Sequence, residues 1–355
     1  MKMIVMRSST RAVVAGLAAL ATITLAGCDN SSPGGSGGKL DVVASFYPLE
    51  FIAKSVGGDA VNVTTLTAPG VEPHDLELTP KQVGTIADAK LVVFEKGLQP
   101  AVDKAIEQNA KDAGFDVAPA AKLEATGANF EEHEEGEAAG PSGSTPSGTT
   151  KPAAYVEPAT ATQSAAHTES AADTEDAAHT EDALDPHFWL DPVRYAGVVQ
   201  AVTDKLVEVD PANAAAYKQR ATTLLGEVTK LDTEYKTGLA DCKLKTFVTS
   251  HEAFAYLAKR YGLTMVGIAG FTPDAEPTPS RIKEVQDIVR EQKVTTIFYE
   301  ELVSPKVAES IARDVHVKTA VLSPIEGLSD ANSQETYLSL MRENLQELRK
   351  ANSCA

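Results

Sequence analysis

The order of strand-like and helix-like segments is the feature that most limits what this chain can fold into. Short apolar, β-branched runs alternate with amphipathic stretches twice, once before residue 126 and again after residue 240. Such alternation is typical of a parallel sheet covered by helices. The expected strands are 41–46, 61–67, 91–94, 115–118, 246–249, 265–268, 294–299 and 317–322. We therefore predict an α/β fold of two similar lobes, each a parallel β-sheet flanked by helices.

Helical spacing of apolar residues between the two blocks predicts one long connecting helix at 212–239. We assign 40–211 to an N-terminal lobe and 240–355 to a C-terminal lobe. Shorter helices are expected at 48–56, 81–89, 101–112, 252–261, 281–292, 305–314 and 336–351. A hydrophobic fraction of 43% excludes global disorder.

Residues 126–185 interrupt the N-terminal lobe with an acidic segment that has almost no large apolar side chains. The segment carries 13 acidic residues, one basic residue (Lys151) and three of the seven histidines. It cannot bury enough apolar area to offset the entropy lost on ordering. We expect a disordered, acidic, His-bearing loop here.

The net charge argues against a nucleic-acid partner. The chain has 50 Asp and Glu against 32 Lys and Arg, a formal charge of −18, whereas nucleic-acid binding requires clustered Lys and Arg. Removing an N-terminal leader with Lys2, Arg7 and Arg11 changes the charge to −21, of which −12 belongs to the loop and −9 to the rest. The acidity is therefore mostly a property of the loop.

Residues 1–27 have the pattern of a secretory signal peptide, a basic start followed by an apolar run at 12–26. This run is shorter than the roughly 20 apolar residues of a transmembrane helix. Residues 25–28 read Leu-Ala-Gly-Cys, which resembles the bacterial lipobox and implies cleavage before Cys28 and lipidation of its thiol. An ordinary signal peptide with an incidental cysteine is the alternative. The Gly- and Ser-rich residues 28–39 are typical of a flexible tether, so we expect a lipid-anchored protein on the outer face of the bacterial cytoplasmic membrane.

The remaining two cysteines, Cys242 and Cys354, would lie in an oxidising compartment under this interpretation. We expect a disulfide between them. Two free thiols are the alternative, because the sequence does not show whether the two Cα atoms approach to bridging distance.

Three histidines stand in positions where metal ligands are expected. His74 lies in the loop leaving a strand, His187 lies between the acidic loop and a helix, and His251 ends a strand. Ligands bind at the carboxyl ends of strands in such sheets, so the three side chains can converge in one cleft between the lobes. Three imidazoles suit zinc, and also copper, nickel or iron(II). For each histidine alone, a buried hydrogen-bonded role is the alternative. His316 at a helix end is interpreted as structural.

Four motifs resemble the cluster A-I metal-binding lipoproteins, the solute-binding subunits of zinc and manganese ABC importers. They are EPHDLELTP at 72–80, DPHFWLDP at 185–192, TSHEAFAY at 249–256 and IFYE at 297–300. The resemblance implies a rigid linking helix, metal bound in the interlobe cleft and delivery to an ABC permease in the membrane. It also implies zinc, because zinc members have His and manganese members have Glu at the position of His251.

One departure from the family leaves the fourth ligand open. Ser323 stands where the family usually has an acidic residue, so the fourth place falls to water or to a nearby carboxylate (Glu300, Glu301 or Glu326). We favour a site of His74, His187 and His251 completed by Glu300 or by water.

The expected function is the capture of zinc and its delivery to an ABC permease for high-affinity uptake, by a monomer without enzymatic activity. A manganese or iron importer subunit and a metal-binding surface adhesin are the alternatives. A zinc hydrolase is disfavoured because the sequence after His251 lacks the second histidine of HExxH. The loop histidines His133, His167 and His179 are interpreted as weak accessory zinc ligands, with a solvated spacer as the alternative.

Overall fold

The computed structural model describes residues 38–125, 184–331 and 333–355. The expected signal peptide, the lipidation of Cys28 and almost all of the tether lie outside the described residues. So do the loop histidines His133, His167 and His179; of the expected loop only Leu184 and Asp185 are described. Residues Lys39–Ala355 form one structural unit.

Two four-stranded parallel sheets form the centres of two lobes, which confirms the predicted fold class. The strand order is β2-β1-β3-β4 in the first sheet and β6-β5-β7-β8 in the second. The same order and the same parallel direction in both sheets make the two lobes similar. In register, Ala44 pairs with Thr65 and Val93, and Thr249 pairs with Gly267. The strands are β1 (Leu40–Ala44), β2 (Val61–Thr65), β3 (Leu91–Phe94), β4 (Gly114–Asp116), β5 (Thr246–Thr249), β6 (Thr264–Gly267), β7 (Thr296–Tyr299) and β8 (Lys318–Val321).

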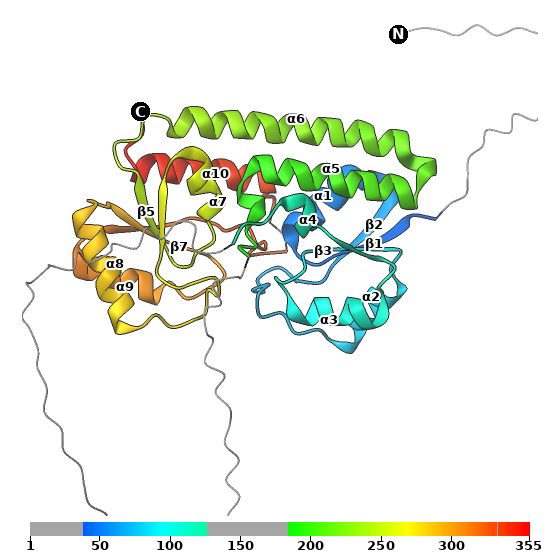
Figure 1. The fold of residues 1–355 in the computed structure, drawn as a ribbon, viewed down its shortest axis with the longest axis horizontal. Coiled ribbons are helices and arrows are strands. Elements are labelled where there is room, and N and C mark those ends of the chain that lie inside the picture. The colour runs from blue at the N-terminus through cyan, green and yellow to red at the C-terminus, as the bar shows by residue number, and fades with distance from the viewer. Residues whose placement is uncertain (1–37, 126–183, 332) are drawn as a thin grey trace, which may run out of the picture. The chain divides into compact units, whose positions relative to one another are not determined.

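Helices cover both faces of each sheet (Figure 1). Helices on one side of the two sheets share a single hydrophobic core that runs through both lobes. These are α1 (Tyr47–Gly57), α5 (Pro192–Val209), α6 (Ala214–Leu239), α7 (Ala255–Tyr261) and α10 (Tyr337–Ala351). The opposite faces carry separate cores under α2 (Pro80–Asp88) and α3 (Pro100–Asn109) in the first lobe, and under α8 (Pro279–Glu291) and α9 (Lys306–Val315) in the second. The described residues also form four short helical turns: η1 (Gly58–Ala60), α4 (Ala118–Ala121), η2 (Phe188–Leu190) and η3 (Pro211–Asn213).

Helix α6 is the long connection between the lobes. It packs on α1 and α5 of the first lobe and on α10 of the second, with Tyr217, Leu224, Leu231 and Tyr235 buried along one face. The apolar spacing read from the sequence thus corresponds to contacts with both lobes. The first two residues of the predicted range, Ala212 and Asn213, belong to the turn η3 rather than to α6.

Several helices begin at a polar cap followed by proline. The side chain of Thr79 accepts the Gln82 N–H, and that of Thr278 accepts the Arg281 N–H; Asp191 caps α5 in the same way. The caps satisfy backbone donors, and proline at the first helical position loses no intrahelical hydrogen bond. These starts fix where the preceding loops end.

The helix predicted at 252–261 begins three residues later than expected. The Glu252 N–H donates to the Gly270 carbonyl over 3.0 Å, and the Thr249 hydroxyl donates to the His251 carbonyl over 2.7 Å. These bonds hold residues after β5 in a loop, so α7 starts only at Ala255. His251 therefore lies in a loop at the strand end, not in a helix.

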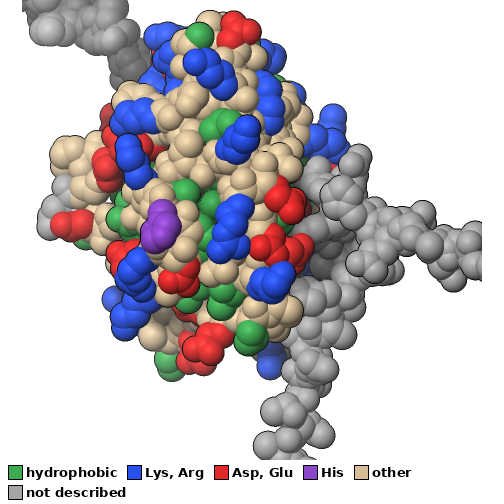
Figure 2. Space-filling model, turned by 90° about the vertical axis from the view of Figure 1, so that its left-hand side faces the viewer, with side chains coloured by type: hydrophobic (Ala, Val, Ile, Leu, Met, Phe, Trp, Pro, Cys, Tyr) green, Lys and Arg blue, Asp and Glu red, His purple; other side chains and the backbone are tan. Residues whose placement is uncertain are grey.

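A disulfide joins Cys242, just after α6, to Cys354, three residues beyond the end of α10, with the Cα atoms 3.7 Å apart. Beside it, the Leu244 N–H donates to the Asn352 carbonyl, so the C-terminal residues are tied to the segment entering β5. No helix within the described ranges is long and apolar enough to cross a membrane. Over the end of the unit where α8 and α9 lie, Lys and Arg side chains are interspersed with Asp and Glu (Figure 2).

Candidate metal centre

Four side chains from loops of both lobes converge at the carboxyl ends of the strands. They are His74, His187, His251 and Glu326, and one possible ligand atom from each lies within 4.8 Å of those of the other three. His74 follows β2, His251 follows β5 and Glu326 follows β8, whereas His187 immediately precedes the turn η2. The convergence at strand ends is the placement expected for a ligand site in such sheets.

The separations of the ligand atoms have the size of a zinc coordination shell. The Glu326 Oε1 atom lies 3.4 Å from His74 Nε2, 3.3 Å from His187 Nε2 and 3.3 Å from His251 Nε2. The two Nε2 atoms of His187 and His251 are 3.3 Å apart. A zinc ion bonded at about 2.0–2.1 Å to a tetrahedron of N and O atoms separates those atoms by about 3.3–3.4 Å. Four of the six separations therefore match one tetrahedral ion, and all six lie within 4.8 Å.

Two further carboxylates hold the outer nitrogens of two of the three imidazoles. The Asp185 Oδ1 atom lies 2.9 Å from His187 Nδ1, and the Glu300 Oε1 atom lies 2.7 Å from His251 Nδ1. Because an ionised carboxylate only accepts hydrogen bonds, each Nδ1 carries the hydrogen and each Nε2 keeps its lone pair for a metal. Carboxylate–histidine pairs of this kind orient metal-binding histidines and raise their basicity.

A tightly held loop presents Glu326. Asn344 of α10 accepts the Ser323 N–H over 2.9 Å and donates to the Ser323 carbonyl over 2.6 Å. The indole N–H of Trp189 donates to the Pro324 carbonyl over 2.7 Å. The next residue, Ile325, has a φ of 58°, a left-handed conformation that is uncommon for a β-branched residue. This turn brings Glu326, not Ser323, to the imidazoles.

Three of the four side chains are closed to solvent. The side chains of His187, His251 and Glu326 are 0%, 1% and 0% exposed, while that of His74 is 10% exposed. An ion would enter past His74.

Burial and the surrounding carboxylates have opposite effects on the pKa values of His187 and His251. Burial lowers the pKa of His187, but hydrogen bonds with Asp185 and Glu326 outweigh it and raise the pKa above its ordinary value. Burial likewise lowers the pKa of His251, and the charge and hydrogen bond of Glu300, followed by Glu326, raise it well above that value. Burial raises the pKa of Glu326, yet the hydrogen bonds from the three histidines lower it well below the usual range. The carboxylates thus favour the protonated forms of His187 and His251, and the imidazoles favour the ionised form of Glu326.

The structure differs from the sequence expectation at the fourth position. Glu300 contacts the Nδ1 side of His251, so it supports that histidine from behind and does not belong to the converging group. The Ser323 hydroxyl accepts the Ile325 N–H. Glu326 takes the place that the expectation gave to Glu300 or water, because the left-handed turn at Ile325 moves the acidic position three residues beyond Ser323.

Sequence reasoning also missed two acids next to the converging histidines, one buried and one half-buried. Asp185, assigned by composition to the acidic loop, is 4% exposed and holds His187. Glu72 accepts the His74 N–H over 3.1 Å; burial, and then the charge of Glu326, raise the pKa of Glu72 to about 9. Both residues stand two positions before a histidine, and that repeated spacing was the signal available in the sequence.

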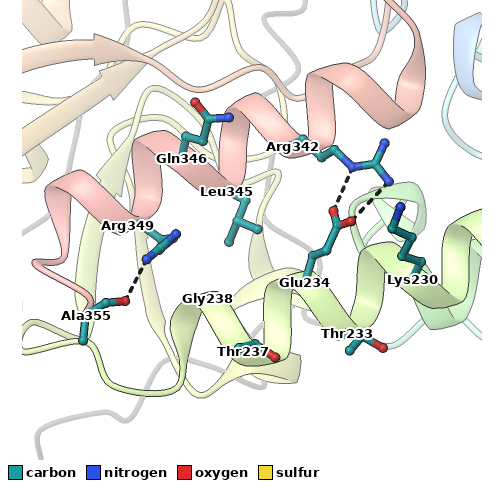
Figure 3. A pocket seen from close by; sticks show the side chains of 10 residues that line it. All are labelled: Lys230, Thr233, Glu234, Thr237, Gly238, Arg342, Leu345, Gln346, Arg349 and Ala355. Carbon is teal, nitrogen blue, oxygen red and sulfur yellow. Dashed lines mark hydrogen bonds and ion pairs between the residues drawn. The ribbon is translucent and has the colours of Figure 1, made fainter.

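A surface groove of about 640 Å³ lies apart from this centre, between α6 and α10. Figure 3 shows Glu234 of α6 facing Arg342 of α10 across the groove. Its lining contains none of the four converging residues, so it plays no part in the metal centre.

Comparison with known proteins gives a consistent family. The family described as ZnuA, zinc-uptake complex component A, periplasmic, matches residues 42–351. The zinc-binding lipoprotein AdcA of Streptococcus pneumoniae (strain ATCC BAA-255 / R6) is 33% identical over 341 residues, which are 94% of this chain and 60% of AdcA. The chain thus spans less than two thirds of that relative. The high-affinity zinc uptake system protein ZnuA of Bacillus subtilis (strain 168) is 33% identical over 92% of this chain and 93% of its own length.

A solved structure shows the same architecture. The Zn(II)-bound ZnuA-like domain of Streptococcus pneumoniae AdcA superposes with a TM-score of 0.65 at 30% identity, covering 89% of this chain and 99% of that domain. The chain belongs to the ZnuA family of periplasmic A components of zinc-uptake complexes.

Proposed function

We propose that this chain captures one zinc ion between its two lobes and delivers it to the membrane permease of an ABC importer. The observation that carries the proposal is the convergence of three imidazole nitrogens and one carboxylate oxygen, with the Glu326 oxygen 3.3–3.4 Å from each of the three nitrogens. His74, His187, His251 and Glu326 are the proposed ligands, and zinc is the cargo of the protein. The zinc-uptake relatives support the delivery step.

The donor set favours zinc over manganese or iron. Imidazole nitrogen suits zinc, whereas manganese prefers carboxylate, carbonyl and water oxygens in octahedral sites. The three buried carboxylates in contact with the histidines (Asp185, Glu300 and Glu326) balance the ion and its ligands. A manganese or iron importer subunit and a surface adhesin are therefore less well supported, since adhesion does not need three convergent histidines.

Four protein ligands also argue for transport without catalysis. A catalytic zinc keeps a position open for water or substrate, whereas a closed four-ligand site does not. A binding protein needs only to take up and release the ion. The proposal therefore includes no chemical step.

We further propose that Cys28 carries a lipid that anchors a monomer to the outer face of the cytoplasmic membrane. The signal-like residues 1–27 and the Gly- and Ser-rich residues that follow support this placement. The similarity to the zinc-binding lipoprotein AdcA of Streptococcus pneumoniae supports it further. Labelling with a radioactive fatty acid should fail in a Cys28→Ser variant if the anchor is correct.

The segment 126–183 is proposed to collect zinc weakly through His133, His167 and His179. Ala125 and Leu184, which flank it, pair in an antiparallel bridge, so a short turn can replace the segment without moving His187. Calorimetric titration of this deletion should keep one tight site and lose the weaker ones. An unchanged stoichiometry would reject the accessory role.

Competition calorimetry tests the principal proposal. Zinc should bind at one site per chain and displace manganese, and His74→Ala, His187→Ala and His251→Ala should each weaken zinc binding at least about tenfold. His316→Ala is the matched control, because His316 is exposed at the end of α9 and outside the group. Normal zinc affinity in all three site variants, or tighter binding of manganese than of zinc, would reject the proposal.

A further inference from the structure

The hydroxyl of Tyr256 connects the lobe that supplies His251 to the segment that carries His187. Tyr256 lies on α7, five residues after His251, and its side chain is buried. Its Oη accepts the Glu124 N–H over 2.8 Å and donates to the Asp185 carbonyl over 2.7 Å. Glu124 and Asp185 are themselves joined, since the Asp185 N–H donates to the Glu124 carbonyl over 3.0 Å.

Asp185 links the hydroxyl of Tyr256 to His187 of the metal centre. Its Oδ1 accepts the His187 N–H over 2.9 Å and lies 2.9 Å from His187 Nδ1. A displacement of the Asp185 backbone therefore moves both the main chain and the ring of His187. The hydroxyl of Tyr256 therefore reaches His187, a proposed zinc ligand, only through Asp185.

The ring of Tyr256 is held independently of its hydroxyl. The Arg194 guanidinium lies 4.1 Å from the ring centroid, and Arg194 in turn donates to the Ala121 carbonyl over 3.1 Å and pairs with Glu124. Lys259 of α7 also pairs with Glu124. A Tyr256→Phe change therefore removes two hydrogen bonds while the ring keeps its packing and its cation contact.

We propose that Tyr256 is a positioning residue of the metal centre, whose hydroxyl sets the place of His187 relative to His251 through the backbone of Glu124 and Asp185. Three imidazoles must meet at one point, and two of them are carried here by segments from different lobes. A group that binds one segment from the other lobe fixes their separation before the ion arrives. The inference rests on the proposed zinc-binding function and adds a residue to it.

The test compares two tyrosine variants. Tyr256→Phe should weaken zinc binding about tenfold, the size of effect seen when partners behind metal ligands are removed, and should shift the visible bands of cobalt(II) bound in place of zinc. Tyr235→Phe is the matched control, because the Tyr235 hydroxyl is also buried and donates to a backbone carbonyl, that of Met341, over 2.6 Å. Both variants should lower the melting temperature of the metal-free protein, but only Tyr256→Phe should change metal affinity and the cobalt spectrum.

A double variant tests whether the effect passes through Asp185. The zinc affinity lost in Tyr256→Phe with Asp185→Ala should be smaller than the product of the two single losses, because both changes release the same histidine. A product of independent losses, or a Tyr256→Phe protein with wild-type affinity and spectrum, would overturn the inference. Failure of the wild-type chain to bind zinc would instead reject the proposed function, so the two failures are distinguishable.

Discussion

At the scale of single residues, three glutamates near the centre have different positions and should respond differently to mutation. Glu326 lies 3.3–3.4 Å from three imidazole nitrogens, Glu300 lies behind His251, and Glu301 is exposed beside it in sequence. Glu326→Gln should weaken zinc binding on the order of 100-fold, Glu300→Gln about tenfold, and Glu301→Gln within about twofold. Chelator competition measures all three, and a larger loss in Glu300→Gln than in Glu326→Gln would restore Glu300 as the ligand.

The protonation of His187, His251 and Glu72 predicts opposite effects of pH on the stability of the metal-free protein and on zinc binding. The pKa values of His187 and His251 are raised in the folded state, so the stabilisation from their protonated forms is complete below about pH 6.5 and is lost as pH rises through the folded-state values. The raised pKa of Glu72, about 9, acts in the same direction, because its ionisation is less favourable in the folded protein. Zinc replaces the imidazole protons, so its affinity rises with pH.

Melting temperatures measured between about pH 6 and pH 9 check this expectation. The difference between the zinc-loaded and the metal-free protein should widen as pH rises. A difference that stays constant or narrows would show that the imidazoles are not protonated in the metal-free cluster.

At the scale of elements, α10 and the loop after β8 act together to place Glu326. Asn344→Ala removes both hydrogen bonds to Ser323 and leaves a buried N–H and a carbonyl unpaired, which should cost about 2–3 kcal/mol of unfolding free energy. Zinc affinity should also fall about tenfold, because the loop loses its anchor. Urea unfolding and chelator competition measure the two effects, with Glu343→Ala on the exposed side of the same helix as control. If the Asn344→Ala protein is destabilised but binds zinc with unchanged affinity, α10 does not help to place Glu326.

Sequence periodicity predicts the elements better than it predicts the loops between them. The strands and helices follow from local apolar patterns, and three histidines at or near strand ends follow from the topology of a parallel sheet. The fourth proposed ligand, Glu326, depends on the left-handed turn at Ile325. A β-branched residue rarely adopts this conformation, so the sequence gives no sign of the turn. Asp185 was assigned to the acidic loop because composition describes a segment and not the partner of one carboxylate.

At the scale of the whole molecule, one hydrophobic core continues through both lobes and a disulfide joins the end of α10 to the segment after α6. The bridge closes a loop with a sequence separation of 112 residues. Replacing both Cys242 and Cys354 by serine should lower the unfolding free energy of the metal-free protein by about 2–5 kcal/mol. Zinc affinity should stay within about twofold, since neither cysteine belongs to the metal group; a large loss would place the bridge in the binding mechanism.

The most direct test of the account is X-ray absorption at the zinc edge of the protein loaded with one zinc ion per chain. We predict four direct ligands, three N and one O, at about 2.0–2.1 Å, with outer scattering from three imidazole rings. In the Glu326→Ala variant the contribution of the carboxylate oxygen should disappear from the spectrum. A shell of six oxygens, or scattering from fewer than three imidazoles, would contradict the claim that His74, His187, His251 and Glu326 hold the ion.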